Sequence, residues 1–237
     1  GGSLSWSLAL SGIFALLGAV NALRLPCATP PATGRVGHLP TAEAGRALSR
    51  RPVLVFCIAI FLASMASAAF GAFFPLYLTD EAGVAPQWIA PITNVGVFLE
   101  VFFMLSFGWF LKRLGFKKLV MAGMLCMALR LALLAIFPSA ATAVVTQAVH
   151  GMVVLAVMVA PVIYLNQQAD SHYRHSIQGL YTVAVIGTSR MAGSFAAGYV
   201  AKASLLSVFA YASVLMTLAA AVLLFAFHDE LAAQAAD

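Results

Sequence analysis

The sequence predicts an all-α membrane protein with about seven transmembrane helices, and three observations lead to this fold class. Hydrophobic residues make up 62% of the 237 residues and charged residues only 9%, whereas soluble domains are about 45–50% apolar and about 25% charged. The mean hydropathy is +0.97. The apolar residues also gather in runs of about 20 residues or more, the length that a helix needs to cross a bilayer.

The first apolar run covers residues 4–23 and ends at Arg24, so residues 1–24 are predicted to form one transmembrane helix. Residues 25–51 form a polar connection with several prolines and four arginines, and we expect an irregular basic linker there. The chain opens with Gly-Gly-Ser and no Met. We therefore expect it to be a fragment of a longer protein.

Six further apolar runs follow, and residues 52–228 are predicted to form a six-helix bundle with a short tail at residues 229–237. The runs cover residues 52–78, 88–111, 119–137, 141–165, 176–200 and 205–227. Pro52 suits the first position of its helix, where a missing N–H leaves no bond unmade. Small residues are frequent in the run 176–200, which predicts close approach of helix backbones.

The distribution of basic residues predicts the orientation in the membrane. If residues 25–51 are cytoplasmic, ten of the thirteen Lys and Arg residues lie on that side, while the opposite loops hold only Lys202 and the spans hold Arg130 and Arg190. Basic residues favour cytoplasmic loops. We therefore expect a multi-pass protein of the bacterial inner (cytoplasmic) membrane with its C-terminus in the cytoplasm. The lipid bilayer, and not nucleic acid, explains the net charge of +5.

Four ionisable side chains lie alone in the middle of apolar runs, namely Glu100, Arg130, His150 and Arg190. At 1.5 Å per helical residue, each lies about 10–16 Å from the outer end of its span, in a hydrocarbon core about 30 Å thick. Charged groups at this depth are costly and mark functional sites. Secondary transporters hold solutes and coupling ions at midplane sites between helices, so the sequence predicts a transport site for a small-molecule solute.

Each of these side chains has an expected role in that site. Glu100, the one acid inside a predicted span, is expected to carry a proton or to accept a hydrogen bond from the solute. Arg130 is expected to be its partner, through a bidentate pair or through solute contact. Gln147 lies one turn before His150 on the same helix face. A neutralised interior carboxylate and a satisfied interior histidine are the purely structural alternatives.

Arg190 is expected either to line the cavity or to bond helix carbonyls, and Asn94 lies on roughly the Glu100 side of its helix. The three cysteines lack metal-ligand spacing, so no metal and no cofactor are expected, with the proton as coupling ion. The sequence contains no H-E-x-x-H pair and no nucleophile beside a base. We therefore expect a protein that is not an enzyme.

The basic turn at residues 108–118 reads G-W-F-L-K-R-L-G-F-K-K. It resembles the gating loop motif of the major facilitator superfamily, in which a Gly, an acid, a basic residue, a second Gly and two basic residues follow at this spacing. The matching residues are Gly108, Arg113, Gly115, Lys117 and Lys118, and Lys112 replaces the acid. The resemblance implies half of such a transporter, with residues 1–24 as helix six of twelve, residues 25–51 as the loop between halves, and residues 52–228 as helices seven to twelve. The missing N-terminal half of the same protein would then be a partner.

An acid in helix eight, an Arg in helix nine and His-Gly in helix ten look like the branch that contains nucleoside:proton symporters and, more distantly, the lactose permease. Residues 164–170 and 174–180 resemble the connection between helices ten and eleven in that branch. This resemblance implies proton-coupled nucleoside symport by alternating access, with Glu100 in the solute and proton site. Residues 152–159 hold no acid, however, and Ser64 and Ser67 stand where amide side chains are expected. Transport of a sugar, an aromatic acid, or a drug or metabolite, including export, therefore remains an alternative, and an intramembrane sensor or enzyme is a remote one.

Overall fold

The computed structural model describes residues 12–13, 16–21, 41–169 and 173–227. Residues 1–38 and 39–237 form two separate units. In the first unit, residues 12–13 and 16–21 are helical. The rest of the predicted helix 1–24, residues 25–40 of the predicted linker, and the predicted tail 229–237 lie outside the described residues. The candidate site belongs to the second unit.

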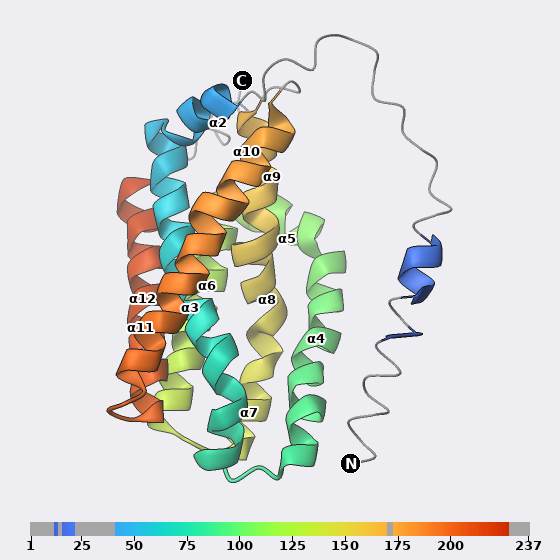
Figure 1. Cartoon of the computed structure of the whole chain (residues 1–237), viewed down its shortest axis with the longest axis vertical. Helices are drawn as coiled ribbons and strands as arrows, with labels where there is room; N and C mark the ends of the chain where they lie inside the picture. The colour runs from blue at the N-terminus through green and yellow to red at the C-terminus, as the bar shows by residue number, and fades with distance from the viewer. Residues whose placement is uncertain (1–11, 14–15, 22–40, 170–172, 228–237) are drawn as a thin grey trace. The chain divides into compact units, whose positions relative to one another are not determined.

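The described residues of the second unit are helical and contain no strand, which confirms the predicted fold class (Figure 1). The α-helices are α2 (Thr41–Leu48), α3 (Arg51–Asp80), α4 (Ile89–Leu105), α5 (Phe107–Leu114), α6 (Phe116–Ile136), α7 (Ala140–Val145), α8 (His150–Val154), α9 (Ala160–Gln168), α10 (Arg174–Tyr181), α11 (Thr188–Val200) and α12 (Leu205–Ala226). Two 3₁₀ turns, η1 (Pro86–Trp88) and η2 (Thr146–Val149), and two π-helical turns, η3 (Leu155–Val159) and η4 (Thr182–Gly187), connect some of them. Two long rods result, one from α7 to α9 and one from α10 to α11.

Within the described residues, five helical segments are long and apolar enough to cross a membrane. They are Arg51–Asp80, Pro86–Leu105, Phe116–Ile136, Ala140–Gln168 and Leu205–Ala226. Each matches one of the predicted apolar runs. The sixth run, predicted at residues 176–200, is also helical from Arg174 to Val200. It is less apolar because Gln178, Arg190 and several Ser, Thr and Gly residues interrupt it.

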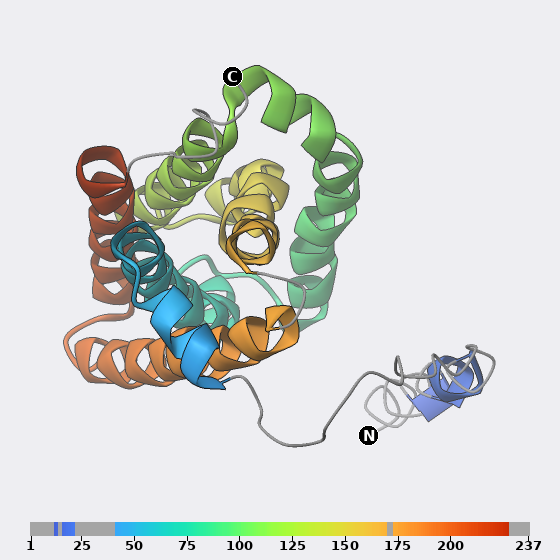
Figure 2. The same cartoon turned by 90° about the horizontal axis from the view of Figure 1, so that it is seen from above.

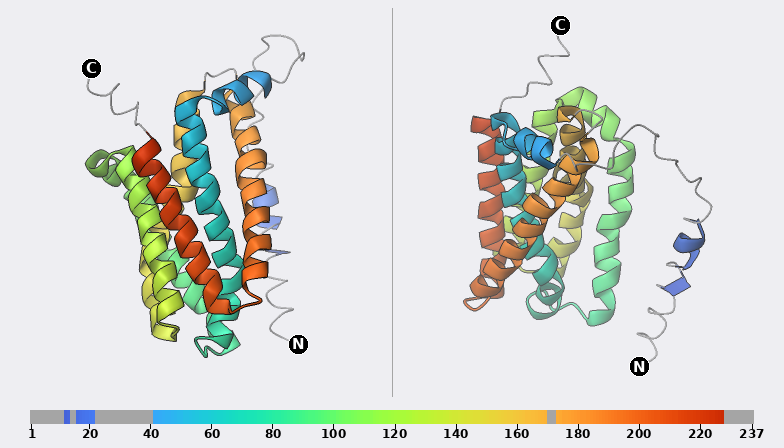
Figure 3. Two further views of the ribbon diagram at one scale, coloured as in Figure 1. Left: turned by 90° about the vertical axis from the view of Figure 1, so that its left-hand side faces the viewer. Right: turned by 45° about the horizontal axis from the view of Figure 1, so that its top comes forward.

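The rod from α7 to α9 lies in the middle of the bundle, with the other helices around it (Figure 2). Helix α12 packs against both α3 and α6 (Figure 3), α11 packs against α3, and α4 packs against α8. Glycines permit these contacts. A Cβ on Gly193 of α11 would lie 2.5 Å from the carbonyl oxygen of Met65 in α3. The small residues of the run 176–200 thus bring two backbones together.

Two segments differ from the sequence-based expectation. Residues 41–48, expected within an irregular linker, form α2, because the prolines of the linker precede this segment and its buried Ala44 and Ala47 pack toward α10. The run 88–111 is not one helix. Helix α4 ends at Leu105, and Ser106 leaves the helical conformation with φ −89° and ψ 0°. The chain then turns into α5, which carries cations that would be costly inside hydrocarbon.

The loop motif forms the corner between α5 and α6. Gly115 has a φ of +73°, a backbone conformation that glycine adopts without steric cost. The guanidinium of Arg113 lies 5.4 Å from the ring centre of Trp109. A Cβ on Gly108 would meet open space, so packing does not require a glycine there. The gating role of the motif remains a prediction.

Lys117 of the motif contacts the end of α12. Its Nζ donates to the carbonyl oxygens of Leu224, at 3.1 Å, and Phe227, at 2.5 Å. The last carbonyls of a helix have no partner within the helix, so this ammonium satisfies them and joins α6 to α12. The neighbouring Lys118 is exposed.

Replacing Lys117 with Met is expected to lower the thermal unfolding midpoint by about 2–4 °C, the shift that corresponds to about 1 kcal/mol in a chain of this size. The physical reason is the loss of the two hydrogen bonds to α12. Scanning fluorimetry in detergent measures the shift, with Lys118→Met as the matched control. An equal shift in both variants would show that the α12 contact contributes nothing specific.

Candidate functional site

Four of the predicted side chains form a continuous polar chain inside the bundle. Arg130 Nη2 donates to Gln147 Oε1 at 2.8 Å, and Arg130 Nη1 lies 3.3 Å from His150 Nδ1. His150 Nε2 in turn lies 3.7 Å from Glu100 Oε2. Arg130 comes from α6, Gln147 and His150 from η2 and α8, and Glu100 from α4. The structure therefore brings together the acid, the arginine and the His/Gln patch that the sequence singled out.

The order of contacts differs from a bidentate pair of Arg130 with Glu100, one of the two expected arrangements, while contact of Arg130 with a solute stays a prediction. The structure places His150 between them, and Nε2 of His150 is the group that lies 3.7 Å from Glu100 Oε2. The reason lies in the arrangement of the helices. The central rod, which runs from α7 to α9, separates α6 from α4. Its polar side chains therefore contact both neighbouring helices.

The direction of the hydrogen bonds follows from the chemistry of arginine. A guanidinium only donates, so Nδ1 of His150 accepts from Arg130. The proton of the neutral imidazole is therefore on Nε2, which faces Glu100. A second proton on His150 would occupy Nδ1 and break the Arg130 contact. Glu100 is therefore the member of the polar chain that can bind an extra proton without disturbing Arg130.

Arg130 is 1% exposed, and aromatic rings complete its surroundings. Its Cζ lies 4.4 Å from the ring centre of Phe70 and 5.6 Å from that of Phe74. Cation–π contacts of this kind stabilise a desolvated cation. Sequence reasoning missed both phenylalanines, because their spacing of four residues is equally typical of an ordinary packing face. In the described part of the chain, Arg130 Nε and Gln147 Nε2 are buried without a hydrogen-bond partner.

Helix α4 reaches the central rod through a glycine. A Cβ on Gly96 would lie 2.5 Å from Gln147 Oε1 and 3.2 Å from His150 Cβ. Gly96 and Glu100 are one turn apart on the same helix face, so this close approach brings the carboxylate to His150. Gly96 and Ile92 are the buried residues of α4, and most of this helix is exposed.

Replacing Gly96 with Ala is expected to destabilise the protein by about 1–3 kcal/mol, the usual cost of overpacking, because the methyl group displaces Gln147 or pushes α4 away. Solute uptake should fall with it. Thermal unfolding and uptake by the complete gene product measure both effects. Gly198→Ala in α11, where a Cβ meets nothing within 4 Å, is the control. Equal behaviour of the two variants would contradict the assigned role of Gly96.

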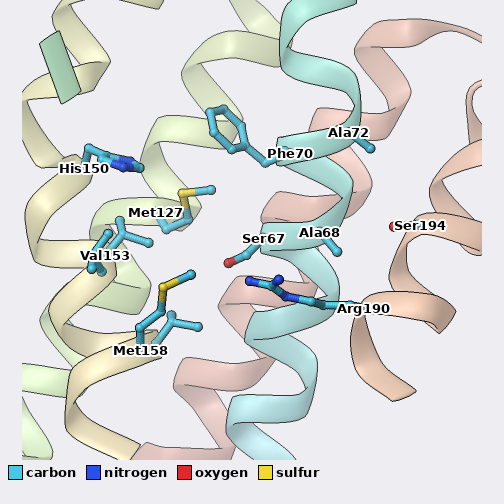
Figure 4. Close-up of a pocket in the computed structure, with 13 residues that line it drawn as sticks. Ser67, Ala68, Phe70, Ala72, Met127, His150, Val153, Met158, Arg190 and Ser194 are labelled. Carbon is cyan, nitrogen blue, oxygen red and sulfur yellow. The ribbon is translucent and has the colours of Figure 1, made fainter. Parts of the chain in front are cut away.

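A cavity of about 480 Å³ adjoins the polar chain. Small-molecule sites commonly have volumes of about 300–1,000 Å³. Its walls come from α3, α6, α11 and the central rod, and they are mainly apolar. Figure 4 shows His150 on one wall and Arg190 extending from the opposite wall, with Ser67 between them in this view. We call this space the main cavity.

The two remaining candidates lie apart from the polar chain. Arg190 lines the main cavity, and its side chain is exposed. Asn94 is exposed on α4 and does not line the main cavity. The structure thus places Arg190, but not Asn94, at the same cavity as His150.

The family of the chain follows from comparison with known proteins. Residues 12–226 match the MFS_1 like family. The chain belongs to this family. The membership confirms the resemblance to the major facilitator superfamily that the loop motif and the intramembrane charges indicated.

A relative of this MFS_1 like chain is the Escherichia coli (strain K12) protein named "Putative nucleoside transporter YegT". The two are 33% identical over 196 residues, which cover 78% of this chain and 44% of that protein. The chain therefore spans less than half the length of this relative. The match is consistent with the predicted likeness to the nucleoside branch of the superfamily.

Proposed function

We propose that the complete protein is a secondary active transporter that moves nucleosides together with protons by alternating access. The observation that carries the proposal is the polar chain from Arg130 through His150 to Glu100, which has His150 in the wall of a solute-sized cavity. A proton on Glu100 and a solute in the main cavity can therefore affect the same histidine. The name of the Escherichia coli relative supports nucleosides as the solute class.

Protonation of Glu100 is the proposed coupling step. An ionised Glu100 attracts the N–H of His150, whose Nε2 lies 3.7 Å from Glu100 Oε2, and this attraction holds α4 against the central rod. A neutral Glu100 loses most of its electrostatic attraction to His150, and α4 loses that restraint. A solute beside His150 then binds with different affinity in the two positions of α4, which links the proton to the solute.

The proposal includes the surroundings of the protein. We place it in the bacterial inner membrane, with residues 25–51 and the C-terminus on the cytoplasmic side, by the positive-inside rule. The N-terminal half of the same protein is the proposed partner that completes the main cavity. The proton is the coupling ion, and no cofactor is required.

Uptake of labelled uridine by the complete gene product in proteoliposomes tests this function. We expect accumulation when an inward proton gradient is imposed, and loss of accumulation when a protonophore dissipates it. Uptake of the same size with and without the proton gradient would contradict symport. No uptake by folded, correctly inserted protein would overturn the nucleoside assignment and direct the same assay to sugars, aromatic acids and exported metabolites.

A further inference from the structure

A second, smaller pocket lies beside the main cavity, and we call it the side pocket. It has a volume of about 260 Å³ and lies between α3, the central rod and the rod from α10 to α11. Arg190, Ser67, Val157 and Met158 line both spaces, so the two adjoin each other. A solute in the main cavity can therefore extend into the side pocket.

Two hydroxyl groups of the side pocket are buried and lack partners. Tyr181 is 4% exposed, and neither its OH nor the Oγ of Ser67 has a hydrogen-bond partner among the described residues. Both residues line the side pocket. Buried polar atoms are nearly always hydrogen-bonded, and an exception calls for an explanation. A polar ligand in the side pocket would satisfy both hydroxyls at once.

Arg190 adds a cation with unused donors. Its guanidinium forms neither a hydrogen bond nor an ion pair with the described part of the chain, although Arg190 lines both spaces. Its place is set by Gly193, three residues later, whose missing side chain lets α11 lie against the backbone of Met65. The guanidinium has five N–H donors and no acceptor. It therefore favours a ligand edge that presents acceptors and disfavours one that presents an amino group.

Among nucleobases, this requirement separates keto from amino bases. A 6-keto purine presents O6 and N7, the pair of acceptors that arginine binds with two parallel bonds, whereas adenine presents an amino donor beside N7. In the same way O4 of a uracil-type base accepts, and the amino group of cytosine donates. Tyr181 and Ser67 can donate to the same edge or accept from a ring N–H.

We propose that the side pocket binds the keto edge of the nucleobase, with Arg190 as the residue that selects keto nucleosides, such as inosine and uridine, over adenosine and cytidine. This inference rests on the proposed nucleoside transport. The sugar end of the solute then lies toward His150 and Glu100. The two ends of one solute thus contact the proton site and the specificity site.

Competition during uptake of labelled uridine tests the inference in the complete gene product. In the unmodified protein, inosine should inhibit at a concentration about tenfold lower than adenosine, and uridine at one about tenfold lower than cytidine. In Arg190→Gln, whose amide both donates and accepts, the inosine to adenosine ratio should fall to about twofold or less. The control Arg174→Gln, at the exposed start of α10, should retain the ratio. Because each ratio is measured within one variant, a general loss of activity does not alter it.

A second readout covers variants that transport poorly. Inosine should raise the unfolding midpoint of the unmodified protein in detergent more than adenosine does, and Tyr181→Phe should weaken the inosine effect. Uridine uptake with equal competition by keto and amino nucleosides would overturn the specificity proposal alone. Absence of uptake and of binding for every nucleoside would overturn the proposed function as well.

Discussion

Replacing Glu100 with Gln is expected to abolish accumulation of labelled solute driven by a proton gradient while solute exchange across the membrane continues. Gln has nearly the shape of a protonated Glu and cannot release a proton, so the attraction between a charged carboxylate on α4 and the N–H of His150 is lost permanently. Exchange requires only that the solute-loaded transporter changes between its two conformations. Accumulation also requires the proton to bind and to leave. The size of the effect should be a loss of all gradient-driven uptake above background.

Two assays on the complete gene product separate these outcomes. Counterflow with solute on both sides measures exchange, and uptake under an imposed gradient measures accumulation. Glu81→Gln is the matched control, because Glu81 follows α3 at the end of its span. Unchanged accumulation in Glu100→Gln would exclude this carboxylate as the coupling group.

Replacing Arg130 with Met is expected to destabilise the protein by about 3 kcal/mol and to lower uptake more than tenfold. The variant loses two charge-assisted hydrogen bonds, each worth about 1.5–3 kcal/mol, and leaves Gln147 Oε1 and His150 Nδ1 without their donor. Free of Arg130, the imidazole can carry its proton on either nitrogen. The N–H of the imidazole then no longer points to Glu100 in every molecule.

Arg130→Lys distinguishes charge from geometry at the same position. A lysine retains the positive charge, but its single ammonium cannot bond both partners as the planar guanidinium does and stack on Phe70 at the same time. We expect an intermediate loss of stability and a loss of uptake close to that of Arg130→Met. Unfolding in detergent and gradient-driven uptake measure the two effects, with Arg174→Met as control. Full uptake in Arg130→Lys would show that charge alone is sufficient.

The sequence predicted which side chains share the site better than it predicted their contacts. Counting residues along each apolar run places Glu100, Arg130, His150 and Arg190 near the midplane, because helical rise is constant. Which side chains meet depends on the rotation of each helix about its axis. That rotation is set by packing contacts between helices, such as the close approach of Gly96 to Gln147. The sequence of one apolar run does not reveal such contacts. The structure shows His150 beside Glu100, whereas a direct pair with Arg130 was one of the two expected arrangements, and contact of Arg130 with a solute stays a prediction.

Other features were beyond the reach of composition and periodicity. The turn at Ser106 interrupts an apolar run that reads as one helix, and the cations that follow it were the available signal. The rings of Phe70 and Phe74 around Arg130 carry no distinguishing pattern in the sequence. The hydroxyls of Ser67 and Tyr181, which have no hydrogen-bond partner among the described residues, become visible only once the neighbours of each atom are known.

The sparse burial of α4 gives a small interaction a large influence on the conformational equilibrium. Helices α3, α6 and α12 bury many apolar residues, but α4 buries Ile92 and Gly96 and contacts the central rod along one side. Where two positions of a helix differ little in free energy, an interaction of about 1.4 kcal/mol changes the ratio of their populations about tenfold. The contact between Glu100 and His150 therefore acts on a long helix that has few buried residues of its own. In a bundle where this acid lay on α3 or α6, the same proton would change the electrostatics of the cavity and leave the populations almost unaltered.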